Sequence, residues 1–396
     1  MLTCRECGRE YPDRATVDVG RWRCVCGHAL DFAERSRSGG APPETLDRDR
    51  GLWAFESLLP VTERVTLGEG WTPLVDAPGW DCQFKLESLF PTGSFKDRGA
   101  TATLSWAVEL GVDRVVEDSS GNAGLAVATY AARAGIDAEI YVPADAAPGK
   151  LRAIERTGAD LVRVEGSRED VTEACIDAVS GGDATDRPDA DPDSGNRTGA
   201  DPADGDRAGG GTDGTDGADA WYASHAWNPA FFAGTSTFAF ELAAQRDWTV
   251  PDAVVTPLGH GTLLLGAYRG FRRLRDAGWT DAVPRLLGAQ ATGAAPVADA
   301  LGGSDDGPAN TVADGIQIRE PARHDQVVDA VTDTGGDAVA VGPAPTEREH
   351  DRLAEAGFYV EPTCATATAA LDRFRERGAL EPGDDVVVAL TGTGLK

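Results

Sequence analysis

The chain has 396 residues and a formal net charge of −28, with 65 acidic residues against 37 lysines and arginines. Such an excess of acid repels nucleic acids and anionic membranes, which excludes both as partners. No apolar run approaches the ~18–20 residues of a membrane span, and the first residues lack the apolar stretch of a secretory signal, so we expect a cytoplasmic protein. The acidity and the scarcity of lysine are typical of a halophilic protein, for which we expect instability in dilute buffer.

Four of the seven cysteines lie near the N-terminus, as two short pairs that are each followed by glycine: Cys4, Cys7, Cys24 and Cys26. Glycine permits the tight turn that aims backbone N–H groups at thiolate sulfurs, so residues 1–32 are predicted to form a zinc ribbon. Four thiolates leave no open position, and the Zn²⁺ would therefore be structural. The alternative is a metal-free tail with reduced thiols. Three scattered cysteines are interpreted as ordinary core residues: Cys82, Cys175 and Cys364.

A charged linker over residues 33–50 is followed by a strand-like run from Phe84 that ends in the turn 91–94. Lys96 comes next, on the first turn of a helix that should end at Gly111. The chain has only four lysines, and arginine cannot form an imine, so this amine is the candidate for a Schiff base with a carbonyl cofactor. The alternative is a solvated surface charge, which is the interpretation we prefer for Lys150.

Strands and helices alternate from residue 112 to residue 164, which predicts a parallel sheet with right-handed crossovers. Between the strand 112–117 and the helix 125–133 lies a loop of small polar residues: Ser119, Ser120, Gly121, Asn122 and Ala123. Free N–H groups, hydroxyl donors and the positive end of the helix dipole converge there, so the loop is suited to bind an anion.

The segment 181–220 contains no Val, Ile, Leu, Met or aromatic residue, and its 11 aspartates face 3 arginines. It cannot bury enough apolar surface to offset the entropy of ordering, so we expect a disordered acidic insertion without chemistry.

In the last third, a helix is expected over 234–246 and a strand begins at Val254. This strand leads into a glycine turn before a helix, Gly259, His260, Gly261, Thr262 and Leu263, where the backbone could close around a phosphate. Such a glycine pair is a weak signal by itself, and His260 could contact a cofactor or face solvent. Further along, a helix is predicted over 366–375, and the strand 386–390 puts the hydroxyl of Thr391 at the carboxyl edge of the sheet.

A lysine, a Ser-Gly-Asn loop, a glycine turn and a strand-end threonine are the parts that a pyridoxal phosphate site needs. The stretches 91–99, 119–122 and 390–396 resemble those of threonine synthases, which are fold-type II pyridoxal phosphate enzymes. The resemblance covers nearly the whole chain outside the insertion. It implies an α/β fold of two parallel or mixed-sheet domains with helices on both faces, the larger from 33–98 and 221–396 and the smaller from 99–180, plus the ribbon.

The resemblance also implies residue roles. Lys96 would form the Schiff base, Asn122 would bond the ring oxygen and Thr391 would meet the ring nitrogen. The turn 259–263 would hold the cofactor phosphate, and the substrate carboxylate would lie on Ser119, Ser120, Gly121 and Ala123. The family reaction converts O-phospho-L-homoserine and water into L-threonine and phosphate, and the resemblance weakly suggests a homodimer.

One departure bears on the substrate. Many threonine synthases carry an arginine and then Gly-Gln-Lys-Thr after the Asn-Pro pair, whereas the run 230–237 here has no cation. A doubly charged substrate needs charged partners, and Arg98 is a candidate to replace them. A sibling enzyme therefore stays open as an alternative: a cysteate synthase, a β-replacing sulfhydrylase or a serine/threonine dehydratase. A non-enzymatic zinc-ribbon protein is the third hypothesis, and the intact lysine and asparagine motifs argue against it.

Overall fold

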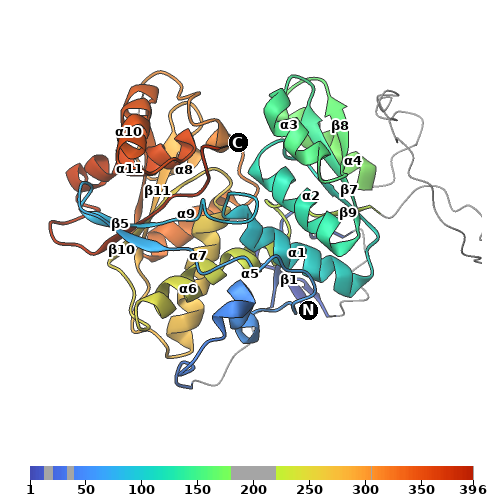
Figure 1. Ribbon diagram of the computed structural model, residues 1–396, viewed down its shortest axis with the longest axis horizontal. Helices are drawn as coiled ribbons and strands as arrows, with labels where there is room; N and C mark the ends of the chain where they lie inside the picture. Colours follow the sequence, from blue (N-terminus) through green and yellow to red (C-terminus); the bar gives the residue numbers. More distant parts are fainter. Residues whose placement is uncertain (13–20, 34–39, 180–219, 305, 396) are drawn as a thin grey trace, which may run out of the picture.

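The computed structural model describes residues 1–12, 21–33, 40–179, 220–304 and 306–395. The predicted acidic insertion lies outside the described residues except for Ala220. Two sheets, each covered by helices, form the body, and a small three-stranded sheet lies at the N-terminus (Figure 1). This is the predicted α/β arrangement of a larger and a smaller unit with an N-terminal attachment.

The larger sheet has the strand order β12-β11-β10-β13-β5-β4. Its strands are β4 (Leu74–Ala77), β5 (Cys82–Lys85), β10 (Ala253–Pro257), β11 (Arg285–Ala291), β12 (Asp337–Val341) and β13 (Val386–Ala389). All neighbours pair in parallel except β4, which runs antiparallel to β5. The central strands are buried on both faces, which explains why they read as continuous apolar runs.

Helices cover both faces of this sheet. On one face, apolar residues such as Val254 and Val387 pack against α5 (Pro229–Thr235), α6 (Thr237–Gln245), α7 (Thr262–Asp276), α8 (Pro296–Ala300) and α9 (His324–Asp333). On the other face, the next residue of each strand, such as Val255 and Val388, packs against helices that include α10 (Pro343–Glu355) and α11 (Pro362–Glu376). The alternation follows from the two-residue period of a strand.

The helix predicted over 234–246 is instead two helices, α5 and α6, which meet at Ser236. The Thr235 hydroxyl donates to the carbonyl of Thr262 at 2.9 Å, and the Ser236 hydroxyl donates to the carbonyl of Ala233 at 2.6 Å. Such side-chain hydrogen bonds compete with the helical backbone pattern, and they accompany the break.

The smaller sheet is all parallel, with the order β8-β7-β6-β9. Its strands are β6 (Arg114–Glu117), β7 (Asp137–Pro143), β8 (Asp160–Val164) and β9 (Trp221–Tyr222), and its helices are α1 (Lys96–Leu110), α2 (Asn122–Ala134), α3 (Pro148–Glu155) and α4 (Arg168–Val179). Helix α1 ends at Gly111 in the left-handed conformation, as predicted. Because β9 pairs with β6, Trp221 and Tyr222 belong to the smaller sheet, and their assignment to the larger domain was wrong.

The N-terminal sheet joins β1 (Leu2–Cys4), β2 (Glu10–Tyr11) and β3 (Leu30–Phe32) in the order β2-β1-β3. Its apolar side packs into the same core as Trp53 of the 3₁₀ segment η1 (Arg48–Leu58) and Trp106 of α1. The N-terminal unit is therefore docked on the body of the molecule.

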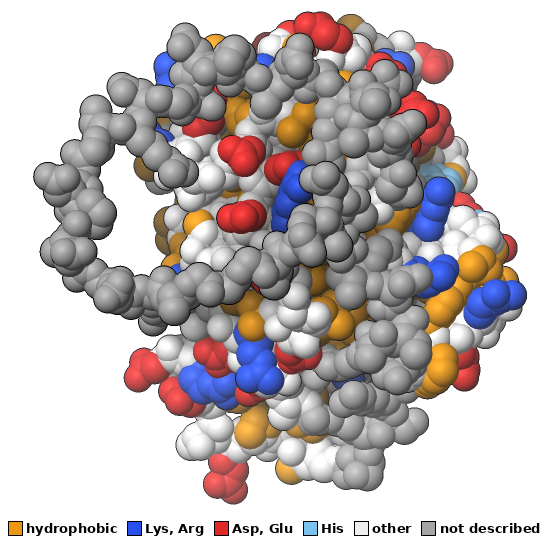
Figure 2. Space-filling view, turned by 90° about the vertical axis from the view of Figure 1, so that its right-hand side faces the viewer, with side chains coloured by type: hydrophobic (Ala, Val, Ile, Leu, Met, Phe, Trp, Pro, Cys, Tyr) orange, Lys and Arg blue, Asp and Glu red, His pale blue; other side chains and the backbone are white. Residues whose placement is uncertain are grey.

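Acidic and basic side chains are interspersed with small hydrophobic patches on the described part of the face shown in Figure 2. Within the described residues, no helix has the length and apolar character needed to cross a membrane.

Candidate active site

The turn before Lys96 is held by the C-terminal segment. The N–H of Phe95 donates to the carbonyl of Thr391 at 3.1 Å, and the N–H of Thr393 donates to the carbonyl of Gly93 at 2.9 Å. The lysine motif and the terminal Thr-Gly motif lie far apart in the chain, and these bonds make them one structural unit at the carboxyl ends of β5 and β13.

The Lys96 amine is half-buried between aromatic rings. Its Nζ lies 5.0 Å from the ring centroid of Phe95 and 5.8 Å from that of Phe231, and it has no hydrogen-bond or ion-pair partner among the described residues. Burial lowers the pKa of Lys96 to about 8, with Glu117 opposing the shift and Arg168 reinforcing it. A substantial fraction of this amine is therefore neutral and nucleophilic near pH 8.

The Ser119–Ala123 loop joins β6 to the N-terminus of α2, where the first N–H groups have no partner within the helix. The turn is tight, because a Cβ on Gly124 would lie 1.8 Å from the carbonyl oxygen of Ser119. The Asn122 side-chain amide donates to Oε2 of Glu361 at 3.0 Å. Within the loop, the N–H of Gly121 donates to the Ser119 hydroxyl oxygen at 3.3 Å, and the binding of an anion here stays a prediction.

The glycine turn 259–263 leads into α7. Gly261 has a φ of 76°, and a Cβ there would lie 2.5 Å from Cγ2 of Val327. The turn therefore requires glycine for its conformation and for the space around it. The His260 ring packs edge-on to His225 with a centroid distance of 5.1 Å, and its Nδ1 is buried without a hydrogen-bond partner among the described residues. This nitrogen faces the interior rather than solvent.

Thr391 is buried at the end of β13, with its hydroxyl 3.5 Å from the Cys364 sulfur. Cys364 is fully buried, as a core residue should be, although it lies next to a predicted site residue. Burial raises the pKa of this thiol to about 12, which keeps it un-ionised at neutral pH.

Three ionisable groups near the lysine were missed by the sequence reading. Glu361 precedes α11 and hydrogen-bonds Asn122. Glu117 ends β6 and accepts a hydrogen bond from the backbone N–H of His225, and its other oxygen lies 2.6 Å from Nδ1 of the same residue. Burial raises the pKa of Glu117 to about 8 and lowers the pKa of His225 well below its usual value. The sequence signal that could have identified Glu117 is an acidic residue at the end of an apolar strand.

Arg168 is the third missed group. It is the half-buried first residue of α4, and one helical turn later the Thr172 hydroxyl donates to Asp118 at 2.6 Å. Because residues four apart share a helix face, Arg168 lies on the face of α4 that contacts Asp118, the residue before the loop 119–123. It makes no hydrogen bond or ion pair within the described residues.

Arg98 cannot be the substrate cation that we had considered. Its side chain is fully buried and donates to Glu87 at 2.7 Å and to Glu241 at 3.1 Å. Helix α1 turns residue 98 toward the core of the larger unit, so this charge is used within the protein.

The four N-terminal cysteines converge as predicted. The sulfurs of Cys4 and Cys26 are 3.5 Å apart and those of Cys7 and Cys24 are 3.6 Å apart, and all four lie within 4.8 Å of one another. The glycines after each pair, Gly8 and Gly27, have positive φ values of 68° and 91°. Four thiol sulfurs so arranged suit a tetrahedral metal ion.

The arrangement around Lys96 fits pyridoxal phosphate. It combines an amine of lowered pKa, a helix N-terminus with obligatory glycine, and an inward-facing imidazole nitrogen without a partner in the described structure. The sequence model of the family described as "Pyridoxal-phosphate dependent enzyme" matches residues 65–392. The chain belongs to this family, and it is therefore an enzyme that depends on pyridoxal phosphate.

Curated relatives of this chain are named threonine synthases. A protein of Methanocaldococcus jannaschii named threonine synthase is 29% identical over 100% of this chain and 93% of its own length. A threonine synthase of Mycobacterium bovis is 31% identical over 87% of each chain.

Among solved structures, maize serine racemase aligns with a TM-score of 0.63 and 22% identity, over 89% of this chain and 94% of that one. The processed form of threonine deaminase isoform 2 from Solanum lycopersicum aligns with a TM-score of 0.62 and 17% identity, over 92% of this chain and 95% of that one. These likenesses define the fold, and together with the family they confirm the predicted fold-type II architecture.

Proposed function

We propose that the chain is a threonine synthase, which converts O-phospho-L-homoserine and water into L-threonine and phosphate. The observation that carries the proposal is the Lys96 amine, which has no partner among the described residues, has a pKa of about 8 and lies close enough to Glu117 at the end of β6 for that charge to affect it. The curated relatives that share 29% and 31% identity over most or all of the chain support this choice of reaction.

Pyridoxal phosphate would be held by Lys96, by the Asn122 amide, by the Thr391 hydroxyl and by the turn 259–263, with its phosphate at the N-terminus of α7. When bound, it supplies an electron sink for negative charge that develops on the substrate carbons. Asn122 is oriented for its part by Glu361, which accepts one of its two amide protons.

The loop 119–123 would bind the substrate carboxylate through its hydroxyls and the free N–H groups of α2. Lys96 would carry protons between Cα, Cβ and Cγ. The C–O bond at Cγ breaks with the electron pair leaving on phosphate, and a water oxygen bonds to Cβ while its proton is taken up by the amine. A largely desolvated amine with a pKa near 8 can accept and return protons at neutral pH.

Arg168 is the best candidate for binding the substrate phosphate. It is a half-buried cation without a partner in the described structure, on the helix face that contacts the residue before the substrate loop. Guanidinium donates paired hydrogen bonds to phosphate oxygens. It would replace the cations that the run 230–237 lacks.

The missing cations after Asn228-Pro229 also favour a second candidate, a sibling enzyme that acts on a less charged amino acid. This run instead contributes Phe231 and Phe232, which are fully buried. A cysteate synthase, a β-replacing sulfhydrylase or a serine/threonine dehydratase would use the same cofactor residues with a different substrate.

The deciding experiment measures phosphate release and threonine formation from O-phospho-L-homoserine, in molar potassium chloride with added pyridoxal phosphate. Equal amounts of threonine and phosphate would establish the activity. A folded protein that carries the cofactor but does not turn over would overturn the proposal, and phosphoserine, O-acetylserine, serine and threonine would then be tested in turn.

We further propose that the cysteine cluster holds one structural Zn²⁺, since its four sulfurs meet the ligand requirements. Metal analysis of the purified protein should give about one zinc per chain, and the variant with Cys7 and Cys26 both changed to serine should lose it. A ratio near zero in the unmodified protein would contradict the assignment. From the composition and the resemblance we also infer a cytoplasmic location, adaptation to salt and a homodimeric state.

A further inference from the structure

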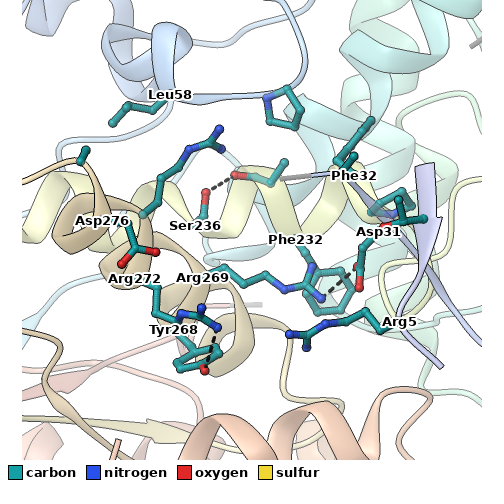
Figure 3. A pocket seen from close by; sticks show the side chains of 17 residues that line it. Arg5, Asp31, Phe32, Leu58, Phe232, Ser236, Tyr268, Arg269, Arg272 and Asp276 are labelled. Atoms are coloured by element: carbon teal, nitrogen blue, oxygen red, sulfur yellow. Dashed lines mark hydrogen bonds and ion pairs between the residues drawn. The ribbon is translucent and has the colours of Figure 1, made fainter. Parts of the chain in front are cut away.

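The N-terminal sheet meets the larger unit beside a cavity of about 470 Å³, whose lining residues include Asp31 of β3 and Arg269 of α7 (Figure 3). The Asp31 carboxylate points toward the Arg269 guanidinium, at a distance of 2.9 Å (Figure 3). A second arginine, Arg323 at the residue before α9, is buried and lies 2.8 Å from the same carboxylate. Two arginines of the larger unit therefore share one carboxylate of the N-terminal sheet.

Arg323 uses all of its hydrogen-bond donors. A guanidinium has five N–H groups. Those of Arg323 meet five acceptors: the Asp31 carboxylate (2.8 Å), the Leu30 carbonyl (2.9 Å), the Gln326 side chain (3.3 Å) and the carbonyls of Ala226 (3.3 Å) and Trp227 (2.7 Å). A buried charge is tolerated when it is paired and its donors are bound, and Arg323 meets both conditions.

The two arginines differ in one respect. Arg269 shares both side-chain acceptors of Arg323, with Asp31 at 2.9 Å and Gln326 at 2.7 Å. Within the described residues, however, Arg269 makes no hydrogen bond to the segment 225–227. Of the two, only Arg323 links the N-terminal sheet to this segment.

The segment that Arg323 holds is part of a tight turn. The N–H groups of Trp227 and Asn228 donate to the Ser224 carbonyl, at 3.3 and 2.9 Å. His225 lies within this turn, directly before the two carbonyls that Arg323 binds. Because these hydrogen bonds close the turn, a displacement of the two carbonyls would displace His225 as well.

His225 connects the turn to the Lys96 site. Its backbone N–H donates to Glu117 at 3.1 Å, and its ring Nδ1 lies 2.6 Å from the other carboxylate oxygen. Glu117 is close enough to Lys96 for its charge to act on the amine. The His225 ring also packs edge-on against His260, at 5.1 Å, in the turn 259–263. The position of His225 therefore affects the surroundings of the lysine and the turn for which we propose phosphate binding.

We propose that Arg323 is a positioning residue of the pyridoxal phosphate site, which acts through the turn that contains His225. Its five acceptors include no residue assigned to the cofactor or the substrate. Its effect on turnover rests on the proposed function. Its effect on cofactor binding does not, because the dependence of the chain on pyridoxal phosphate follows from its family.

The test compares Arg323→Gln with Arg269→Gln as the matched control. Each variant leaves Asp31 one arginine partner, so both proteins should fold. Each holoenzyme is freed of its cofactor and titrated with pyridoxal phosphate in molar potassium chloride, and the absorbance band at roughly 410–430 nm reports binding. The dissociation constant should rise about tenfold in Arg323→Gln, because the turn of His225 loses two hydrogen bonds, and should be unchanged in Arg269→Gln.

A merely structural role predicts a different result. Urea unfolding should show that both variants are less stable than the wild type, since each removes an ion pair between the N-terminal sheet and the larger unit. Cofactor affinity that is unchanged in Arg323→Gln, or weakened equally in Arg269→Gln, would overturn the proposal, because Arg323 would then only dock the N-terminal sheet.

If Arg323→Gln does not fold, Arg323→Lys decides. This variant keeps the charge beside Asp31 but has three donors in place of five. The dissociation constant should rise severalfold, and an unchanged value would overturn the proposal.

Turnover gives a second measurement. With saturating cofactor, phosphate release from O-phospho-L-homoserine should be severalfold slower in Arg323→Gln than in Arg269→Gln, because Glu117 near Lys96 loses its fixed partner. Equal rates would contradict an effect on the lysine. A cofactor affinity that changes as expected in a protein without turnover would support the role of Arg323 while the proposed reaction fails.

Discussion

Two lysines on either side of one turn, Lys85 and Lys96, have opposite surroundings. Lys85, at the end of β5, is fully buried and paired with Glu241, and it donates to the Thr72 carbonyl at 2.5 Å and to Gln245 at 2.9 Å. Lys96, at the start of α1, has no such partner among the described residues. A buried charge with all its partners in place stabilises one arrangement of the chain, whereas an amine without a partner is available for reaction.

The network around Lys85 is shared by two carboxylates and Arg98. Burial alone would raise the pKa of Glu241, but Arg98 and Lys85 lower this pKa to about 2, so the carboxylate stays ionised. Glu87 completes the network through Arg98 at 2.7 Å and the Thr72 hydroxyl at 2.7 Å. Of the four lysines, Lys85 therefore has a structural role, whereas Lys96 is the one for which we propose a role in catalysis.

The largest expected effect comes from Lys96→Ala. Turnover should fall by at least about a thousandfold, because the variant has no amine to hold the cofactor or to move protons. An absorbance band at roughly 410–430 nm, expected of the bound cofactor, should disappear as well. The control Lys150→Ala removes the half-exposed lysine that pairs with Asp314 and should leave both signals intact. If Lys96→Ala retained both the absorbance band and turnover, the choice of Lys96 as the Schiff-base lysine would be wrong.

Lys85→Ala should instead lower the free energy of unfolding, by about 3–5 kcal/mol, because it leaves Glu241 buried without its ammonium partner. Urea unfolding in molar potassium chloride measures this loss. The same Lys150→Ala control breaks an exposed ion pair and should cost at most about 1 kcal/mol. A Lys85→Ala protein of unchanged stability would show that the network contributes nothing, and the contrast between the two lysines would fail.

Protonation of Glu117, which lies near Lys96, makes the stability of the protein depend on pH. Its folded-state pKa of about 8 lies above the usual 4.5, so the folded protein binds more protons between these values than the unfolded chain. Its contribution to stability is therefore complete below pH 4.5 and is lost as the pH rises toward 8. Glu117→Gln does not titrate and should reduce the decline between about pH 5 and pH 8 by about 3–4 kcal/mol. The test measures the free energy of unfolding of the variant and the wild type at pH 5 and at pH 8. An equal decline in both proteins would contradict the prediction.

Arg168→Gln should give the smallest effect, about a tenfold rise in KM for O-phospho-L-homoserine with kcat nearly unchanged, because it removes a charged contact to the substrate phosphate. Arg168→Lys should restore part of the affinity. Arg163→Gln, on the exposed side of β8, serves as the control. A KM that is unaffected in Arg168→Gln would leave the substrate phosphate without its proposed partner and strengthen the case for a sibling enzyme.

Much of the fold could be predicted from local patterns. The α/β alternation from 112 to 164 and the left-handed helix end at Gly111 are confirmed, because periodicity and capping depend on near neighbours in the chain. The break between α5 and α6 was missed because it involves a hydrogen bond from Thr235 to Thr262, 27 residues away. The pairing of β9 with β6 was missed for a similar reason, since so short a strand carries almost no periodicity.

The sequence by itself determined the motifs of the site: a lysine after a tight turn, donors at a helix N-terminus, a glycine turn and a strand-end threonine. Each of these depends on a few consecutive residues and on backbone geometry that those residues impose. Only the tertiary structure decided where the long charged side chains point. It turned Arg98 into the core, placed Arg168 on the face of α4 that contacts Asp118 and brought Glu361 to Asn122. These directions depend on packing between elements that are distant in the chain, which no local pattern encodes.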